Sequence, residues 1–158
     1  MRVLFLDDRA PNAVAVQAVL SDAGFDVTVA RDVPQALVAL DADEFAVVLT
    51  QQRMAGLRGV DFLERCAREH PAPMRLLMTS YSDAPAAEAA IARGIIHQLV
   101  WTPWTSGELT TAVRAAARSY ELSFVINEDT PLVPREIDDD EMPAITEKFA
   151  AAPRLVSR

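Results

Sequence analysis

The sequence predicts an α/β protein built on an open, doubly wound sheet of five parallel strands. Five short apolar runs alternate with five segments of helical spacing in the first ~120 residues, which is the pattern of a parallel sheet with crossover helices. Five such repeats are too few to close a (β/α)₈ barrel, so the sheet is expected to stay open. The length of 158 residues fits one compact domain with a short extension.

The expected strands are short runs rich in apolar and β-branched residues, at 3–6, 27–29, 45–49, 74–79 and 95–101. The expected helices run from Pro11 to Gly24, from Asp32 through Leu40, over 60–68, from Asp83 to Gly94, and from Thr105 or Ser106 to about Tyr120. Asp32 and Asp83 each precede a proline by two residues, so both are expected to cap the helix that follows. Gly24 is expected to end the first helix, because glycine readily adopts the left-handed conformation found after helix ends.

Composition narrows the classes of function. The net charge of −8 and the pI near 4.7 argue against nucleic acid or an anionic membrane as the main partner. The single cysteine, Cys66, excludes an internal disulfide and a cysteine-based zinc site, and His70 and His97 stand apart in the sequence. No apolar run has the length of a secretory signal or a membrane span, so a cytoplasmic location is expected. Lys148 is the only lysine.

Polar residues stand where four of the expected strands end, at Asp7-Asp8, at 50–52, at 79–80 and at 101–103. In open parallel sheets, binding sites form beyond the carboxyl ends of the strands. The acidic pair suits a hard divalent cation such as Mg²⁺, or is simply polar where a strand meets solvent. Thr79 likewise either contacts a phosphoryl oxygen or satisfies backbone groups.

Four motifs in order resemble the receiver domains of bacterial two-component response regulators. They are Leu4-Phe5-Leu6-Asp7-Asp8, the loop Arg53-Met54-Ala55-Gly56-Leu57-Arg58-Gly59, the segment Met78-Thr79-Ser80-Tyr81-Ser82-Asp83, and Leu99-Val100-Trp101-Thr102-Pro103-Trp104. The resemblance covers residues 2–120. It implies the flavodoxin-like (βα)₅ receiver fold, a role in signal transduction, and a cis peptide bond between Thr102 and Pro103.

The same resemblance shows departures from the family pattern. Gln51 stands where the family has the aspartate that accepts a phosphoryl group, and Thr102 stands where it has a lysine. Leu99 replaces the aromatic residue of the family's conformational switch, whereas Asp7, Asp8 and Thr79 are kept. We therefore expect a degenerate pseudo-receiver that is not an enzyme, has no cofactor, and binds Mg²⁺ weakly if at all.

The expected function is a phosphorylation-independent protein-interaction module. The alternatives are a regulatory domain of a larger signalling enzyme, of the cyclic-di-nucleotide phosphodiesterase type, or a receiver phosphorylated at another residue. Expected partners are a signalling protein, a histidine kinase or a downstream effector, or a second copy that binds through the fourth helix, fifth strand and fifth helix. The candidate residues of this surface are Tyr81, Leu99, Trp101, Pro103 and Trp104.

Two features leave alternatives open. Arg9, Arg53 and Arg58 near the strand ends either bind an anionic group or are merely solvated. Residues 121–158 are acidic and contain four prolines, yet they are too apolar for a pure spacer. One alternative is that the last helix extends through about Asn127 and the rest forms a docking arm. The others are a recognition segment that a partner orders, and a linker. The expected domains are therefore 1–120 and 121–158.

Overall fold

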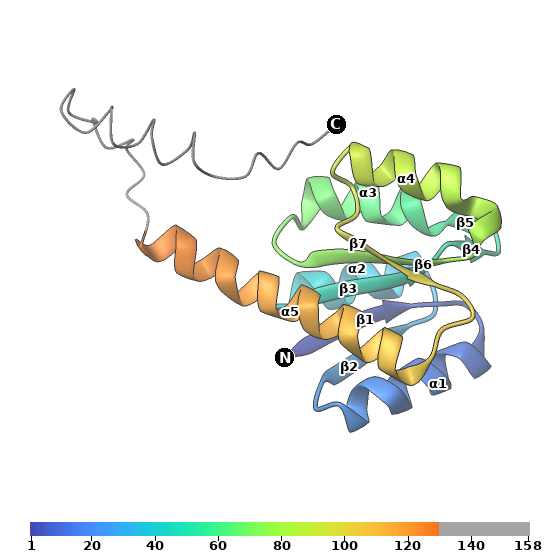
Figure 1. Cartoon of the computed structure of the whole chain (residues 1–158), viewed down its shortest axis with the longest axis horizontal. Helices are drawn as coiled ribbons and strands as arrows, with labels where there is room; N and C mark the ends of the chain where they lie inside the picture. Colours follow the sequence, from blue (N-terminus) through green and yellow to red (C-terminus); the bar gives the residue numbers. More distant parts are fainter. Residues whose placement is uncertain (130–158) are drawn as a thin grey trace, which may run out of the picture. The chain divides into compact units, whose positions relative to one another are not determined.

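The computed structural model describes residues 1–129, of which residues 1–125 form one compact unit. The elements along the chain are β1 (Arg2–Leu6), α1 (Ala10–Asp22), β2 (Asp26–Ala30), α2 (Val33–Ala42), β3 (Val47–Gln51), β4 (Arg53–Met54), β5 (Leu57–Arg58), α3 (Gly59–Glu69), β6 (Met74–Thr79), the 3₁₀ turn η1 (Tyr81–Asp83), α4 (Ala84–Ala92), β7 (Gln98–Trp101) and α5 (Ser106–Asp129). The five long strands form a parallel sheet in the order β2-β1-β3-β6-β7 (Figure 1). The predicted fold class is confirmed.

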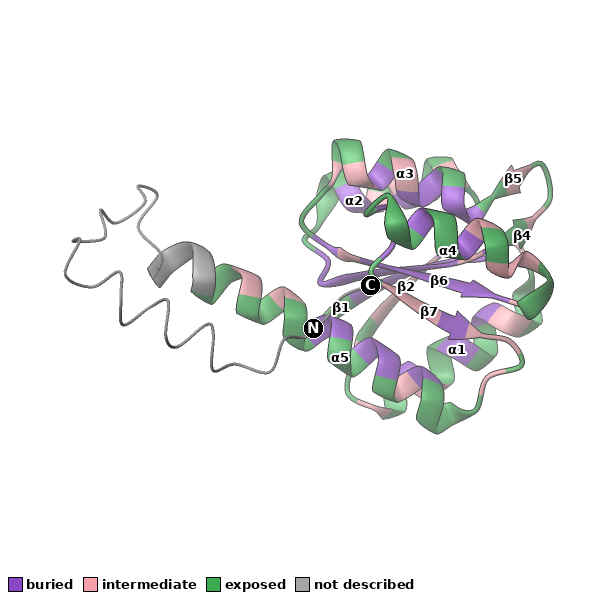
Figure 2. Cartoon of the chain, turned by 45° about the horizontal axis from the view of Figure 1, so that its top comes forward, coloured by how far each residue is buried: buried purple, intermediate pink, exposed green. Residues whose placement is uncertain are grey.

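The helices cover both faces of the sheet. One buried cluster joins α1 and α5 to residues such as Val3, Phe5 and Leu49, and the other joins α2, α3 and α4 to residues such as Leu4 and Val48. Consecutive strand residues therefore face opposite cores, which explains why the central strands are almost wholly apolar. The central strands β1, β3 and β6 are mostly buried, the edge strands β2 and β7 are mostly half-buried, and the helices expose their outer faces (Figure 2).

Two of the five strands differ from their expected bounds by more than one residue. The third strand begins at Val47, not at residue 45, and continues through the polar residues Thr50 and Gln51. The fifth strand begins at Gln98, because the preceding Ile95 still donates its N–H to the Ala90 carbonyl at the end of α4. In both cases pairing with the neighbouring strand, and not the apolar run, decides where the strand lies.

The helix signals are confirmed at three positions. The Asp32 carboxylate accepts a hydrogen bond from the Gln35 N–H at 2.9 Å, and Gly24 follows α1 with φ of 94°. Thr105 caps α5, where its hydroxyl accepts from the Glu108 N–H at 3.1 Å while the Glu108 carboxylate accepts from the Thr105 N–H. The expected end of this helix near Tyr120 is wrong, and the alternative of an extension through about Asn127 is confirmed.

Asp83 does not cap α4, contrary to the expectation. Its carboxylate makes no capping hydrogen bond and instead forms a bidentate ion pair with Arg53, at 2.8 and 3.0 Å. Both a cap and an ion pair would be charge-assisted contacts of this carboxylate, but the Arg53 guanidinium donates two hydrogen bonds to it where a cap offers one.

Two further elements complete the fold. The antiparallel β4–β5 ribbon, which the sequence pattern did not predict, turns at Gly56 with φ of 74°. None of the described helices is long and apolar enough to cross a membrane. The arm, recognition segment or linker expected in the C-terminal extension lies, from residue 130 onward, outside the described residues.

Candidate functional site

The carboxyl ends of β1, β3, β6 and β7 bring the predicted site residues to one edge of the sheet. Leu6 pairs with Thr50 in the β1–β3 register, so Asp7 and Gln51 follow side by side. Gln51 pairs with Met78, and Thr79 pairs with Trp101. The sheet thus places Asp7, Gln51 and Thr79 on three adjacent strands.

Each carboxylate of the acidic pair has one bonded oxygen and one free oxygen. Asp7 Oδ1 accepts from the Arg9 N–H at 2.9 Å, and Asp8 Oδ2 accepts from the Ala55 N–H at 2.7 Å. Among the residues that the structure describes, three buried oxygens have no hydrogen-bond partner: Asp7 Oδ2, Asp8 Oδ1 and Gln51 Oε1. Asp7 is fully buried, and burial raises the pKa of its carboxyl above the ordinary value of 3.8, with a smaller contribution from Asp8.

These three oxygens fit a hard divalent cation, which prefers carboxylate and amide oxygens. Asp7, Asp8 and Gln51 would hold it, and its charge would neutralise the two carboxylates. The described residues contain no group of three or more histidine, cysteine, aspartate or glutamate side chains suited to a metal ion. The donor set therefore has two charges instead of three, so weak Mg²⁺ binding stays the prediction.

Arg31 supports the acidic loop and was missed in the sequence. It directly follows β2, and its guanidinium donates to the Asp7 carbonyl at 3.1 Å and the Asp8 carbonyl at 2.7 Å. Applying the strand-end rule to the second strand as well would have identified this position. Arg31 fixes the backbone of the acidic pair without neutralising the carboxylates.

Gln52 and Gly59 connect the site to α3, and neither role was predicted. The buried Gln52 side chain accepts from the Val60 N–H at 2.9 Å, so an amide oxygen satisfies the start of the helix. Gly59 lies against the backbone of Gln51, where a Cβ atom would collide with the Gln51 carbonyl. Only glycine fits there, and α3 is thereby held against the end of β3.

A hydrogen bond between backbone groups joins the ends of β6 and β7. Thr79 is buried, its hydroxyl donates to the Ser80 carbonyl at 3.4 Å, and its own carbonyl accepts from the Thr102 N–H at 2.8 Å. The Thr102–Pro103 peptide bond is cis, as the resemblance implies. Thr102 is half-buried beside this edge.

The predicted surface residues separate into two groups. Tyr81 is 72% exposed and stacks on Trp101, with ring centroids 4.5 Å apart and planes 8° from parallel. Leu99 packs partly buried against the α2–α3–α4 core, whereas Trp104 packs against the α1–α5 core. Tyr81 and Pro103 are therefore exposed, whereas Leu99, Trp101 and Trp104 are half-buried.

The arginines near the strand ends are mostly paired. Arg53 is held by Asp83, and hydrogen bonding to this guanidinium lowers the pKa of the Asp83 carboxyl. Arg58 contacts Asp61 at 3.3 Å. Arg9 lines a cavity of about 400 Å³ together with Asp8 and Arg53. An anionic ligand would meet the Asp8 carboxylate in that cavity, so the arrangement disfavours anion binding.

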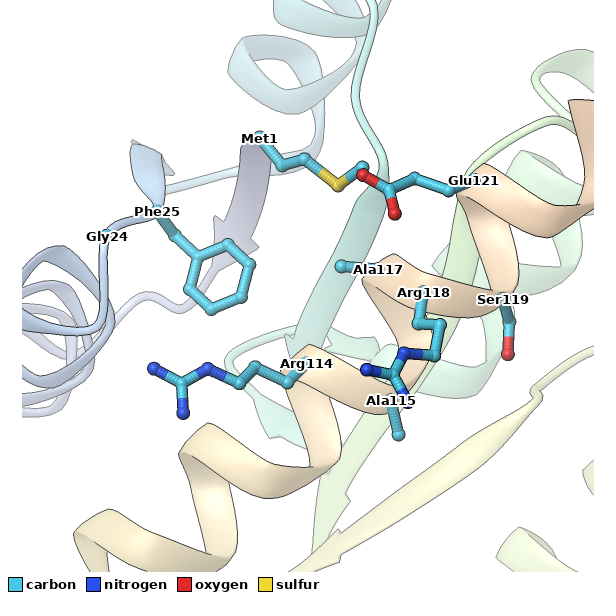
Figure 3. A pocket seen from close by; sticks show the side chains of 9 residues that line it. All are labelled: Met1, Gly24, Phe25, Arg114, Ala115, Ala117, Arg118, Ser119 and Glu121. Carbon is cyan, nitrogen blue, oxygen red and sulfur yellow. The ribbon is translucent and has the colours of Figure 1, made fainter.

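A cavity of about 680 Å³ lies elsewhere, between the start of β1, the α1–β2 turn and α5 (Figure 3). Arg114 and Arg118 extend along it from α5 and Phe25 lies across from them, while Glu121 lies at its other end. Arg114 donates weakly to the Ala23 carbonyl at 3.5 Å. This open cavity shares no residue with the strand-end site.

Comparisons with known proteins agree with this architecture. The transcriptional regulatory protein FixJ of Bradyrhizobium diazoefficiens is 33% identical over 120 residues, covering 75% of this chain and 58% of FixJ. The hydrogenase transcriptional regulatory protein HoxA of Cupriavidus necator is 30% identical over 120 residues, covering 76% of this chain and 25% of HoxA. The chain thus matches well under two thirds of the length of either relative.

A solved structure and a family model complete the comparison. The signal receiver domain of an HD domain-containing protein from Pseudomonas fluorescens Pf-5 is 27% identical, with a TM-score of 0.72, and the match covers 78% of this chain and 90% of that one. The model of the response regulator receiver domain matches residues 3–114, which include every strand of the sheet and the whole acidic site. The chain belongs to the response regulator receiver domain family.

Proposed function

We propose that this receiver is a phosphorylation-independent protein-interaction module of a two-component signalling pathway and is not itself an enzyme. The observation that carries the proposal is Gln51 at the end of β3, between the acidic pair of β1 and Thr79 of β6. A carboxylate in this position can attack phosphorus and form an acyl phosphate. A glutamine amide is neutral and forms no acyl phosphate.

The site also lacks a lysine ammonium group at the end of β7. Thr102 precedes the cis proline where the family has a lysine, and the single lysine of the chain, Lys148, lies far along the sequence. A threonine hydroxyl carries no charge to stabilise a phosphoryl group. The losses of one negative and one positive group offset each other, so the edge of the sheet keeps its charge balance without a metal.

The partner would dock on the surface formed by α4, β7 and α5, where Tyr81 and Trp101 are stacked. Exposed aromatic side chains contribute strongly to protein interfaces. A histidine kinase, another signalling protein or a downstream effector fits this role, and a homodimer through the same surface stays a prediction. A cytoplasmic location and the absence of membrane contact also stay predictions. The absence of nucleic-acid contact stays a prediction because both curated relatives are named transcriptional regulators.

A second candidate is the regulatory receiver of a larger signalling enzyme. The observation in its favour is the likeness to a receiver that belongs to an HD domain-containing protein, at 27% identity. In that case the interaction surface would serve a catalytic domain joined to the receiver, and the receiver would still act without accepting a phosphoryl group.

The test uses the full chain with acetyl phosphate and Mg²⁺, followed by intact-mass spectrometry. We expect no phosphoryl adduct on the wild type. The matched control is the double variant Gln51→Asp, Thr102→Lys, which restores both groups and should gain one adduct. Acid-stable or acid-labile phosphate on the wild type, mapped to Thr50, Asp7 or Asp8, would instead establish a non-standard phosphorylation site.

An NMR titration with Mg²⁺ and then beryllofluoride, which mimics an aspartyl phosphate, completes the test. We expect weak shifts with Mg²⁺ and none specific to beryllofluoride. Saturable beryllofluoride shifts around Asp7, Asp8 and Thr79 would contradict the proposal.

A further inference from the structure

We infer that the free edge of β7 is a docking groove for an extended segment of a partner protein that carries alternating apolar and basic side chains. The inference rests on the proposed function and adds to it the chemistry of the partner. An extended segment would pair with β7 as a sixth strand and place its side chains along α5 and α4.

The topology leaves this edge open. Among the described residues, β7 is the last strand of the sheet and pairs only with β6. Every second N–H and C=O group along its outer side therefore has no strand partner in this part of the chain, which is the template for strand addition. β7 lies between α4 and α5 (Figure 2), and with four residues it offers room for a short segment only.

A groove of about 470 Å³ runs along this edge. All four residues of β7 line it, and the first turns of α5 form the opposite wall with Gly107, Glu108, Thr111 and Ala112. Gly107 and Ala112 have little or no side chain, so this wall stands close without filling the space. The groove therefore exposes backbone on one side and a smooth helical surface on the other.

Apolar side chains lie at the end of the groove on β7 and on the exposed surface of the neighbouring helix α4. Trp101 lies at its end with Tyr81 stacked on it. On α4, Arg93 pairs with Glu64 of α3, which marks the side of the helix that faces α3. Ile91, 43% exposed, lies about 200° around the helix from Arg93, hence on the side away from α3.

The charge of the groove indicates a basic segment. Glu108 is the single charged residue that lines it, and its carboxylate forms no ion pair within the described residues. A second copy bound through the same surface would bring like charges together, so the charge favours a different, cationic protein.

The experiment titrates the ¹⁵N-labelled full chain with a short acetylated peptide of alternating valine and arginine. We expect saturable shifts at Gln98, Val100, Glu108 and Thr111. A peptide of alternating valine and glutamate should bind at least about tenfold more weakly, because Glu108 would repel it. The same valine–arginine peptide with alternate N-methylated amides keeps its side chains but loses its donors, and should lose most of its affinity.

Two matched variants locate the binding. Thr111→Arg places a long cationic side chain in the groove and should weaken binding about tenfold, whereas Ser119→Arg, an equal charge change on the exposed side of the same helix, should leave it unchanged. Glu108→Gln keeps the capping oxygen of α5 and should weaken binding several-fold, less so at high salt.

Several outcomes would overturn the inference: no binding, binding that N-methylation leaves unchanged, shifts outside the groove, or concentration-dependent dimerisation through it. The titration is repeated with Mg²⁺ and beryllofluoride so that the two proposals fail separately. Binding that requires beryllofluoride contradicts the proposed function, whereas beryllofluoride-independent binding outside the groove contradicts the inference alone.

Discussion

The substitution Asp7→Asn should stabilise the protein. The Asp7 carboxylate is fully buried beside Asp8, its Oδ2 atom has no hydrogen-bond partner, and burial raises its pKa above 3.8. Asparagine removes the buried charge and the repulsion from Asp8. It keeps the oxygen that accepts from the Arg9 N–H, and it leaves no unpartnered charged oxygen at the position of Oδ2.

The expected increase in the free energy of unfolding follows from these contacts. The relief of one buried, desolvated charge is worth about 1–2 kcal/mol. For a compact unit of 125 residues this corresponds to a rise in Tm of about 4–8 °C. Because the folded-state pKa is raised, the stability associated with this carboxyl is present below pH 3.8 and lost as pH rises through the folded-state pKa. The advantage of the variant should therefore appear at neutral pH and vanish in acid.

The assay is thermal unfolding by circular dichroism in EDTA, across a pH series. Glu88→Gln, which removes one exposed negative charge of α4, serves as the control and should leave Tm nearly unchanged. Added Mg²⁺ should raise the Tm of the wild type slightly and that of Asp7→Asn not at all. A variant less stable than the wild type at neutral pH would show that the carboxylate is satisfied in the fold, and the reasoning would be refuted.

Three further perturbations test the surrounding contacts. Gln52→Ala should lower the free energy of unfolding by about 1–3 kcal/mol in urea, because it leaves a buried N–H of α3 without its acceptor; an unchanged midpoint would refute the capping role. Arg53→Gln should raise the pKa of Asp83 toward its ordinary value, measured by NMR titration of the side-chain carboxyl; no change would mean that the ion pair does not persist in solution. Burial and the nearby Arg75 guanidinium lower the pKa of His97, whose Nδ1 accepts from the Arg75 N–H at 2.9 Å. The stability associated with the neutral imidazole is therefore present above pH 6.5 and lost as pH falls through the folded-state pKa. His97→Asn should remove this pH dependence of the urea midpoint.

Short-range pattern was enough to predict the framework of the site. Apolar runs identified the strands, and prolines, glycines and an aspartate cap identified the helices between them. The rule that parallel strands end at one edge then placed Asp7, Gln51 and Thr79 together. These features are local, since a strand needs its own apolar side chains and a cap needs a residue within three positions. The missing acceptor was indicated by the resemblance to the receiver family, which has an aspartate at the position of Gln51.

Contacts between distant segments were decided by the tertiary structure alone. Asp83 carries the local signal of a helix cap, yet Arg53, 30 residues away, takes its carboxylate in a two-point ion pair. Arg31 bonds to backbone carbonyls of Asp7 and Asp8 more than 20 residues earlier. The open edge of β7 exists because the order of strands in the sheet places it last, and strand order depends on which faces pack together. Strand order and contacts between distant residues depend on the packing energy of whole layers. The alternation of strands and helices, in contrast, is already present in each short stretch of sequence.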